Sequence, residues 1–310
     1  VRLVGSEMCI RDRSDAWWLM NGIWNVSYGS THNVNEDLCW EEKSELNFGF
    51  DYSFLDNRLF GKFDLYKRKV DGLIYSVSVP VPPNVHDQTT MNMGDLENRG
   101  WELEIGGEPV RTRDFSYRTT MRFSHNTSKI KSLWDNSTYQ DRKSMPDPGS
   151  PGTAVRLQAG STIGDYFLWR YAGVDENGEW LVYDKNNKVI PEKEKTVDDK
   201  SYVGNAIPKL ILAWENTFTY KNWDMTILIR SWLGYDVFNT LNMYYGTKTL
   251  GGSNVLKTAF TDNQHVKSTQ LLLSDYWLEN GSFLKIDAIN IGYNLSLRKY
   301  NKYIDNIRLY

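Results

Sequence analysis

The stretch that decides the fold is ELNFGFDYSF, residues 45–54. Its large apolar and aromatic side chains stand at every second position, and polar residues or glycine stand between them. The first set is Leu46, Phe48, Phe50, Tyr52 and Phe54, and the second is Glu45, Asn47, Gly49, Asp51 and Ser53. A period of two places the sets on opposite faces of a β-strand. This predicts a strand with one apolar and one polar face, longer than the usual length of about five to six residues.

The same alternation recurs along the chain in pairs that predict long hairpins. The turn Leu55-Asp56-Asn57 leads into a second strand over 58–74. Further strands are predicted over 101–106, 115–124, 210–220, 223–229, 289–297 and 303–310, with another near 17–28. Together these make about nine strands, whose short turns alternate with long polar connections as in an outer-membrane barrel.

The long connections, residues 131–207 and 236–281, are rich in polar and turn-forming residues and are predicted to be large loops, the first of them structured. A β-sandwich has shorter strands and evenly short turns. We therefore predict an all-β protein, an antiparallel transmembrane β-barrel fragment with short periplasmic turns and long extracellular loops.

Composition excludes several classes of function. The 310 residues carry 36 basic and 39 acidic side chains, a net charge of −3, so we expect no nucleic-acid partner. Two cysteines are too few for a disulfide framework or a zinc site. Aromatic residues form 14% of the chain, a content that suits sheets, membrane-interface girdles or sugar-binding surfaces.

Motifs of enzymes are absent from the sequence. It contains no glycine-rich phosphate loop, no HExxH and no nucleophile elbow. The histidines, His32, His86, His125 and His265, are scattered singly. We therefore predict that the chain is not an enzyme, has no catalytic or metal-binding residues and needs no cofactor.

Two groups of aromatic residues are candidate sites. Tyr220 and Trp223 flank the turn Lys221-Asn222, where their rings would form part of an interfacial girdle; ordinary strand packing is the alternative. Trp169, Tyr171 and Trp180, in the first long loop, could stack on a substrate. Internal packing of a folded loop is the favoured explanation for them.

Arg118 and Arg122 share the predicted polar face of one strand. They could line a polar path for a substrate, or pair with Glu102 and Glu104 on the preceding strand.

The ends of the chain differ from the rest. Residues 1–13, VRLVGSEMCIRDR, show neither strand alternation nor the apolar core of a signal peptide, and we expect this segment to be non-native. Residues 14–310 would then form the barrel part, with a last strand that stops in mid-course at Tyr310.

Several stretches resemble the SusC/RagA family of TonB-dependent outer-membrane transporters of Bacteroidetes. They are NEDLCWEEKSELNFGFDYSFLDNRLFGKFDL (35–65), GDLENRGWELEI (94–105), VGNAIPKL (203–210), GYDVFN (234–239) and SDYWLENGSFLKIDAINIGYNL (274–295). The resemblance implies a barrel of about 22 strands, of which this chain is a C-terminal part without the plug domain. It also implies energy coupling through TonB-ExbB-ExbD by way of the N-terminal part, and a SusD-like surface lipoprotein as partner.

Glycan or peptide import is the function that this resemblance implies, with an oligosaccharide or peptide as substrate and outer-membrane lipid around the barrel. Two alternatives stay open at this point. A soluble extracellular carbohydrate-binding β-protein would use the same aromatic richness, and a passive porin would share the barrel.

Overall fold

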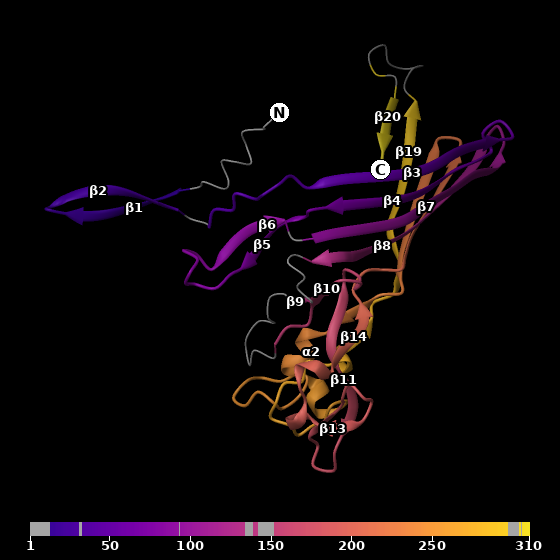
Figure 1. Cartoon of the computed structure of the whole chain (residues 1–310). Coiled ribbons are helices and arrows are strands. Elements are labelled where there is room, and N and C mark those ends of the chain that lie inside the picture. The colour runs from indigo at the N-terminus through magenta and orange to yellow at the C-terminus, as the bar shows by residue number, and fades with distance from the viewer. Residues whose placement is uncertain are drawn as a thin grey trace.

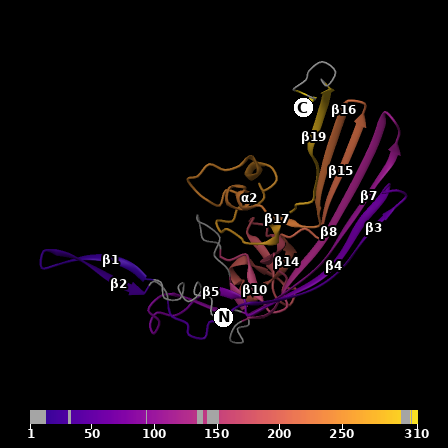
Figure 2. The same ribbon diagram turned by 90° about the horizontal axis from the view of Figure 1, so that it is seen from above.

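The computed structural model describes residues 13–30, 33–92, 94–133, 139–141, 152–296, 304 and 306–310. Its largest element is an eight-stranded antiparallel sheet, here called the wall. Successive strands of the wall change direction progressively from one edge to the other (Figures 1 and 2). In spatial order the strands are β20 (Asn306–Leu309), β19 (Phe283–Ser296), β16 (Trp223–Leu233), β15 (Leu210–Tyr220), β8 (Phe115–Leu133), β7 (Gly94–Arg111), β4 (Leu59–Asp71) and β3 (Glu42–Phe54).

Local sequence explains the hairpins of the wall. Leu55, Asp56 and Asn57 all have positive φ, and the N–H of Arg58 donates to the carbonyl of Leu55, so the predicted β3–β4 turn is confirmed. The β7–β8 and β15–β16 connections are equally short. All three turns lie at the same end of the wall.

Cross-strand register gives the wall two chemically different faces. Directly paired residues point to the same side, so each row of partners shares a face. One row consists of Phe50, Phe63, Leu103, Phe123 and Leu212, and the neighbouring row on the opposite face consists of Asp51, Lys62, Glu104, Arg122 and Ala213. The apolar face is bare, with Leu46 75% and Leu284 71% exposed. The predicted alternation is therefore confirmed across the sheet.

The strand expected near residues 17–28 is wrong in detail. The segment forms a separate hairpin of β1 (Arg13–Met20) and β2 (Ile23–Ser30), outside the wall. Asn21 and Gly22, both with positive φ, make the turn that this dipeptide favours. The strand predicted over 58–74 also divides, because Gly72 has a φ of 65° and separates β4 from a second outlying hairpin, β5 (Ile74–Ser78) and β6 (Gln88–Asn92).

The two long loops fold together into one lobe, at the end of the wall opposite the short turns (Figure 1). The first loop supplies β9 (Tyr139–Asp141), β10 (Arg156–Gln158) and a four-stranded sheet of β11 (Asp165–Val174), β12 (Trp180–Tyr183), β13 (Val189–Pro191) and β14 (Lys200–Asn205), with 3₁₀ turns η2 (Glu192–Glu194) and η3 (Val197–Asp199). The second supplies β17 (Asp236–Phe238), α2 (Thr240–Tyr245), η4 (Lys257–Phe260), η5 (Asp275–Trp277) and β18 (Leu278–Asn280).

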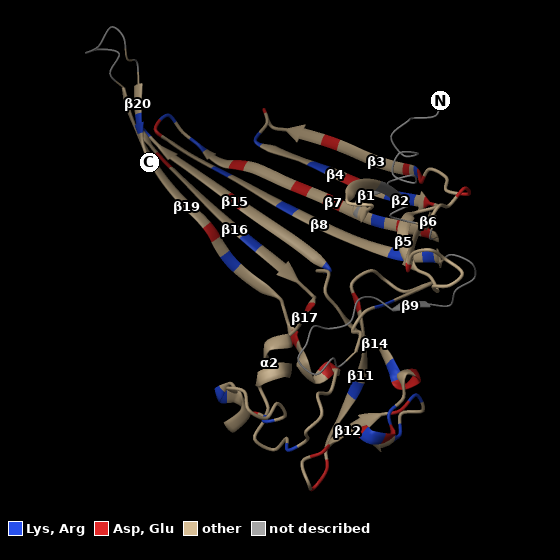
Figure 3. Ribbon diagram, turned by 90° about the vertical axis from the view of Figure 1, so that its left-hand side faces the viewer, with Lys and Arg blue, Asp and Glu red and all other residues tan. Residues whose placement is uncertain are grey.

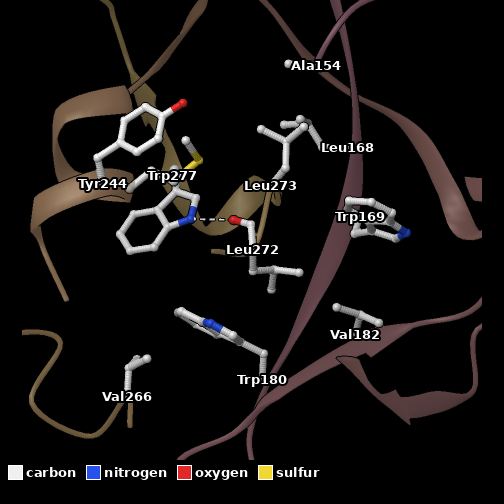
Figure 4. Packing of buried hydrophobic residues seen from close by; sticks show 11 residues of the cluster. Ala154, Leu168, Trp169, Trp180, Val182, Tyr244, Val266, Leu272, Leu273 and Trp277 are labelled. Atoms are coloured by element: carbon white, nitrogen blue, oxygen red, sulfur yellow. Dashed lines mark hydrogen bonds between the residues drawn. The ribbon is translucent and has the colours of Figure 1, made fainter. Parts of the chain in front are cut away.

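The lobe has a core to which both loops contribute (Figure 4). Leu168 and Trp180 come from the first loop, and Leu272, Leu273 and Trp277 come from the second; all are at most 2% exposed. The Nε1–H of Trp277 donates to the carbonyl of Leu272 over 2.8 Å. The prediction of two separate loops therefore missed a single packed unit.

Among the described residues, no helix has the length and apolarity needed to cross a membrane. Some predicted residues lie outside the described part of the chain: residues 1–12 of the segment expected to be non-native, Leu297 of the strand predicted over 289–297, and Tyr303 and Asp305 of the expected last strand.

Candidate functional site

The polar face of the wall carries a network of ion pairs centred on Arg122. Its Nε lies 2.7 Å from Glu104 Oε2, and its Nη1 lies 3.2 Å from Glu215 Oε2. The network thus joins β7, β8 and β15. The predicted pairing of Arg122 with Glu104 is confirmed, whereas Arg118 instead lies over the ring of Phe60, with its guanidinium carbon 4.5 Å from the ring centroid.

The network borders a groove of about 430 Å³ on the wall. Lys62, Asp64 and Glu102 also line it, so both charge signs are present. Further along the same face, Asp287 Oδ2 lies 2.9 Å from Arg230 Nε, and Asp287 Oδ1 lies 3.0 Å from Lys285 Nζ. This face can therefore contact water or a polar solute over most of its width.

A larger cleft of about 720 Å³ opens where the wall meets the lobe. Here β8 changes partner. Its pairing with β15 ends at Ser124, and beyond that point the N–H of Ile163, in the lobe, donates to the carbonyl of Ser128 over 2.8 Å. The cleft lies in this fork and is lined by residues 125–128 of β8 together with residues from both long loops.

Three polar side chains tie the two loops together at the cleft. Asn205 Nδ2 donates to Asp165 Oδ1 over 2.6 Å, and the N–H of Asn205 donates to Asp236 Oδ2 over 3.0 Å. Gly204, next to them, has a φ of 68°, and a Cβ there would lie 2.7 Å from Asp236 Oδ2. The cleft thus has a fixed polar rim of carboxylate and amide groups. Sequence reasoning missed these residues, although each lies beside or close to a glycine at a strand end.

Burial limits the predicted substrate contacts in the lobe. Trp180 is 1% exposed and Trp169 is 8% exposed. Their indole N–H groups donate to Gln270 O over 3.1 Å and to Thr196 O over 2.8 Å. These positions are what the internal-packing alternative expects. Of the three predicted residues, Tyr171 alone is partly exposed, and substrate contact stays a prediction.

A partly buried carboxylate, that of Asp275, lies next to the aromatic residues around Tyr171. The N–H of Tyr171 donates to Asp275 Oδ1 over 2.6 Å, which joins β11 of the first loop to η5 of the second. The Tyr171 and Tyr276 ring centroids are 4.6 Å apart. Burial raises the pKa of the Asp275 carboxyl despite this hydrogen bond, and it also raises the pKa of both tyrosine hydroxyls.

Tyr220 and Trp223 lie at the turn end of the wall on its apolar face, and each is 52% exposed. They pair with each other, Tyr220 also pairs with Phe115, and Trp223 also pairs with Tyr293. An aromatic row therefore crosses four strands here. Its membrane-interface role stays a prediction.

The described part of the chain holds no grouping of three or more His, Cys, Asp or Glu side chains placed to bind a metal ion. Of the four scattered histidines, His125 lines the cleft, with Nδ1 2.5 Å from the carbonyl oxygen of Lys209.

The curated proteins that the chain resembles in sequence are TonB-dependent receptors. The chain is 30% identical over 273 residues to TonB-dependent receptor SusC of Bacteroides thetaiotaomicron, an alignment that covers 84% of this chain and 26% of SusC. It is 25% identical over 304 residues to TonB-dependent receptor P3 of Formosa agariphila, covering 90% of this chain and 30% of P3. No family model matches.

Solved structures of the RagAB peptide transporter share the fold. One has a TM-score of 0.73 at 19% identity, and the superposition covers 96% of this chain and 34% of the RagAB chain. The chain thus spans about a quarter to a third of the length of the relatives it matches.

Proposed function

Because the chain belongs to the SusC/RagA family of TonB-dependent outer-membrane receptors, we propose that it forms part of the wall of an energy-coupled importer. Its polar face would line the lumen, and its apolar face would contact lipid. In outer-membrane barrels the short turns are periplasmic and the long loops are extracellular. The lobe and the cleft would then face the outside of the cell, where a substrate arrives.

The observation that carries this proposal is the continuity of polar surface from the cleft to the wall. Ser124 lines the groove, and Asn126 and Ser128, at the next two positions on the same face of β8, line the cleft. A substrate that enters at the lobe would pass from fixed carboxylate and amide groups to the charged network around Arg122. Its transfer needs binding and release alone, without covalent chemistry.

The partners follow from the same proposal. A SusD-like lipoprotein would cover the extracellular lobe, and TonB-ExbB-ExbD would act through a plug in the whole receptor. The substrate would be an oligosaccharide or a peptide, and RagAB, which shares the fold, is a peptide transporter. Amide and carboxylate groups at the cleft can hydrogen-bond either class.

A labelling experiment tests this assignment in cells that express the receptor from its complete reading frame. In a background without the native cysteines, Ser124→Cys places a thiol in the groove, and Met121→Cys places one on the apolar face as a matched control. Uptake is followed with two fluorescent probes, a pool of short peptides and a pool of short oligosaccharides.

We expect a bulky thiol reagent at residue 124 to block uptake of one pool, and the same label at residue 121 to leave uptake intact. A protonophore should also abolish uptake. Uptake that persists with the protonophore would indicate a passive porin. Equal loss with both labels would contradict the assignment of the faces.

A further inference from the structure

Basic residues gather on the apolar face of the wall, just beyond its apolar rows. Cross-strand register places Lys67 beside Arg99, and in the next row it places Lys69 beside Glu97 and Glu97 beside Lys129. Leu65 lies two positions before Lys67, and Trp101 lies two positions after Arg99. All four side chains therefore share one face. The basic rim is defined here as Lys67, Lys69, Arg99 and Lys129.

A buried carboxylate holds the centre of the rim. Glu97 is 7% exposed, with Oε2 3.1 Å from Lys67 Nζ and Oε1 2.7 Å from Arg99 Nη2. The two cations remain open to the outside, with 50% and 62% of their side chains exposed. Because Glu97 occupies only some of their donors, the others can bind a second anion.

Charge is arranged in order along the face. The rows nearest the apolar surface carry the four cations of the rim and a single carboxylate, that of Glu97. The next row carries the acidic pair Glu42 and Asp71, and Asp71 Oδ1 lies 2.5 Å from Lys69 Nζ. Figure 3 shows basic and acidic bands together at this end of β4, β7 and β8. Positive charge is therefore greatest directly against the apolar surface.

The height of the rim places it at a membrane boundary. Phe115 lies in the aromatic row at the turns, and His125 lies beside Trp101, further along β8. The strand between them is about 33 Å long at about 3.3 Å per residue. A strand tilt of about 40° reduces this to about 25 Å, the height of the apolar band of an outer-membrane barrel. The rim starts one row further out, in the layer of lipid headgroups.

We propose that the basic rim binds the phosphate groups of a lipid in the outer leaflet of the outer membrane. The acyl chains of this lipid would lie on Leu65, which is 50% exposed and stands two positions before Lys67 on β4, and on Leu46, which is 75% exposed and pairs with Lys67 across the strands. This continuity of cation and bare apolar surface favours a lipid over an acidic protein, which would leave the apolar rows uncovered. The site is separate from the cleft and does not depend on which substrate is carried.

The test measures lipid binding by the full-length receptor in detergent micelles. The probes are phosphorylated lipid A, the same lipid A without phosphate, and inorganic phosphate as a competitor. Lys69→Gln with Lys129→Gln removes two rim cations but leaves both ion pairs of Glu97, so the buried carboxylate keeps its partners. The matched control, Lys43→Gln with Arg68→Gln, removes two cations from the opposite face of the neighbouring strands.

We expect phosphorylated lipid A to bind to the wild type and the control alike. The rim variant should bind it about thirtyfold more weakly, since each cation near an anionic surface contributes about a factor of five. Lipid A without phosphate should bind to the wild type as weakly as phosphorylated lipid A binds to the rim variant. The proposal would be overturned if both lipids bound equally well, or if the control lost as much binding as the rim variant. Displacement of the lipid by millimolar inorganic phosphate would also overturn it, because that would show a general anion site.

Discussion

Replacement of Trp180 by alanine would show whether this residue holds the lobe together or waits for a substrate. Trp180 is 1% exposed and packs at right angles to Trp277 of the second loop, with ring centroids 6.0 Å apart. Truncating a buried tryptophan costs about 3–5 kcal/mol, and the lost hydrogen bond to Gln270 O adds about 1 kcal/mol. We therefore expect Trp180→Ala to destabilise the lobe by about 4–6 kcal/mol.

The measurement is limited proteolysis of the lobe in outer-membrane vesicles. When cleavage follows the population of locally opened molecules, a loss of about 4 kcal/mol raises the cleavage rate about a thousandfold. Trp180→Phe, which keeps most of the ring volume, should give a much smaller rise, and Trp40→Ala, at a residue that is 55% exposed, should give none. A wild-type rate of cleavage in Trp180→Ala, together with weaker substrate binding, would refute the packing role.

Three further substitutions test other parts of the molecule. Gly204→Ala should destabilise the base of the lobe by about 1–3 kcal/mol in the same assay, because alanine is strained at positive φ and its Cβ would meet Asp236 Oδ2. Asp275→Asn should flatten the pH dependence of lobe stability. Because burial raises the folded-state pKa of Asp275, the stabilisation from its protonated carboxyl is full below the ordinary pKa of 3.8 and is lost as pH rises through the raised pKa. Thermal unfolding between about pH 4 and pH 8 measures this loss in the wild type and its absence in the variant. Tyr117→Phe removes the hydroxyl that donates to Asn216 Oδ1 over 2.7 Å on the apolar face, and should lower wall stability by about 1–2 kcal/mol in urea unfolding from detergent.

The wall could be predicted from sequence because its determinants are local. Alternation within residues 45–54 fixes the two faces of β3, and the turn at Leu55–Asn57 fixes its partner. The pair Arg122 and Glu104 followed from the same pattern, since their strands are joined by a short turn. Glu215 could not be added to that pair, because the whole first loop separates β8 from β15 and no turn sets their register.

The lobe and the cleft depend on contacts between segments far apart in the chain. In the sequence Trp180 groups with Trp169 and Tyr171 and has no local link to Trp277, and the two tryptophans share a core because both loops fold together. Asp236 likewise meets Asn205 only in that assembly. Local periodicity carries no information about such pairings, whereas the Asn21-Gly22 turn was a local signal that could have been used.

In the proposed barrel, one face of the wall contacts lipid and the other contacts the aqueous lumen. Spin labels placed one at a time at residues 115–125 of β8, in the receptor in its outer membrane, distinguish the two faces. We predict that accessibility to oxygen peaks at the odd positions, such as Met121 and Phe123, and that accessibility to a water-soluble nickel chelate peaks at the even ones, such as Arg122. High accessibility to the nickel chelate at odd and even positions alike would exclude lipid contact by either face and indicate a sheet with both faces in water.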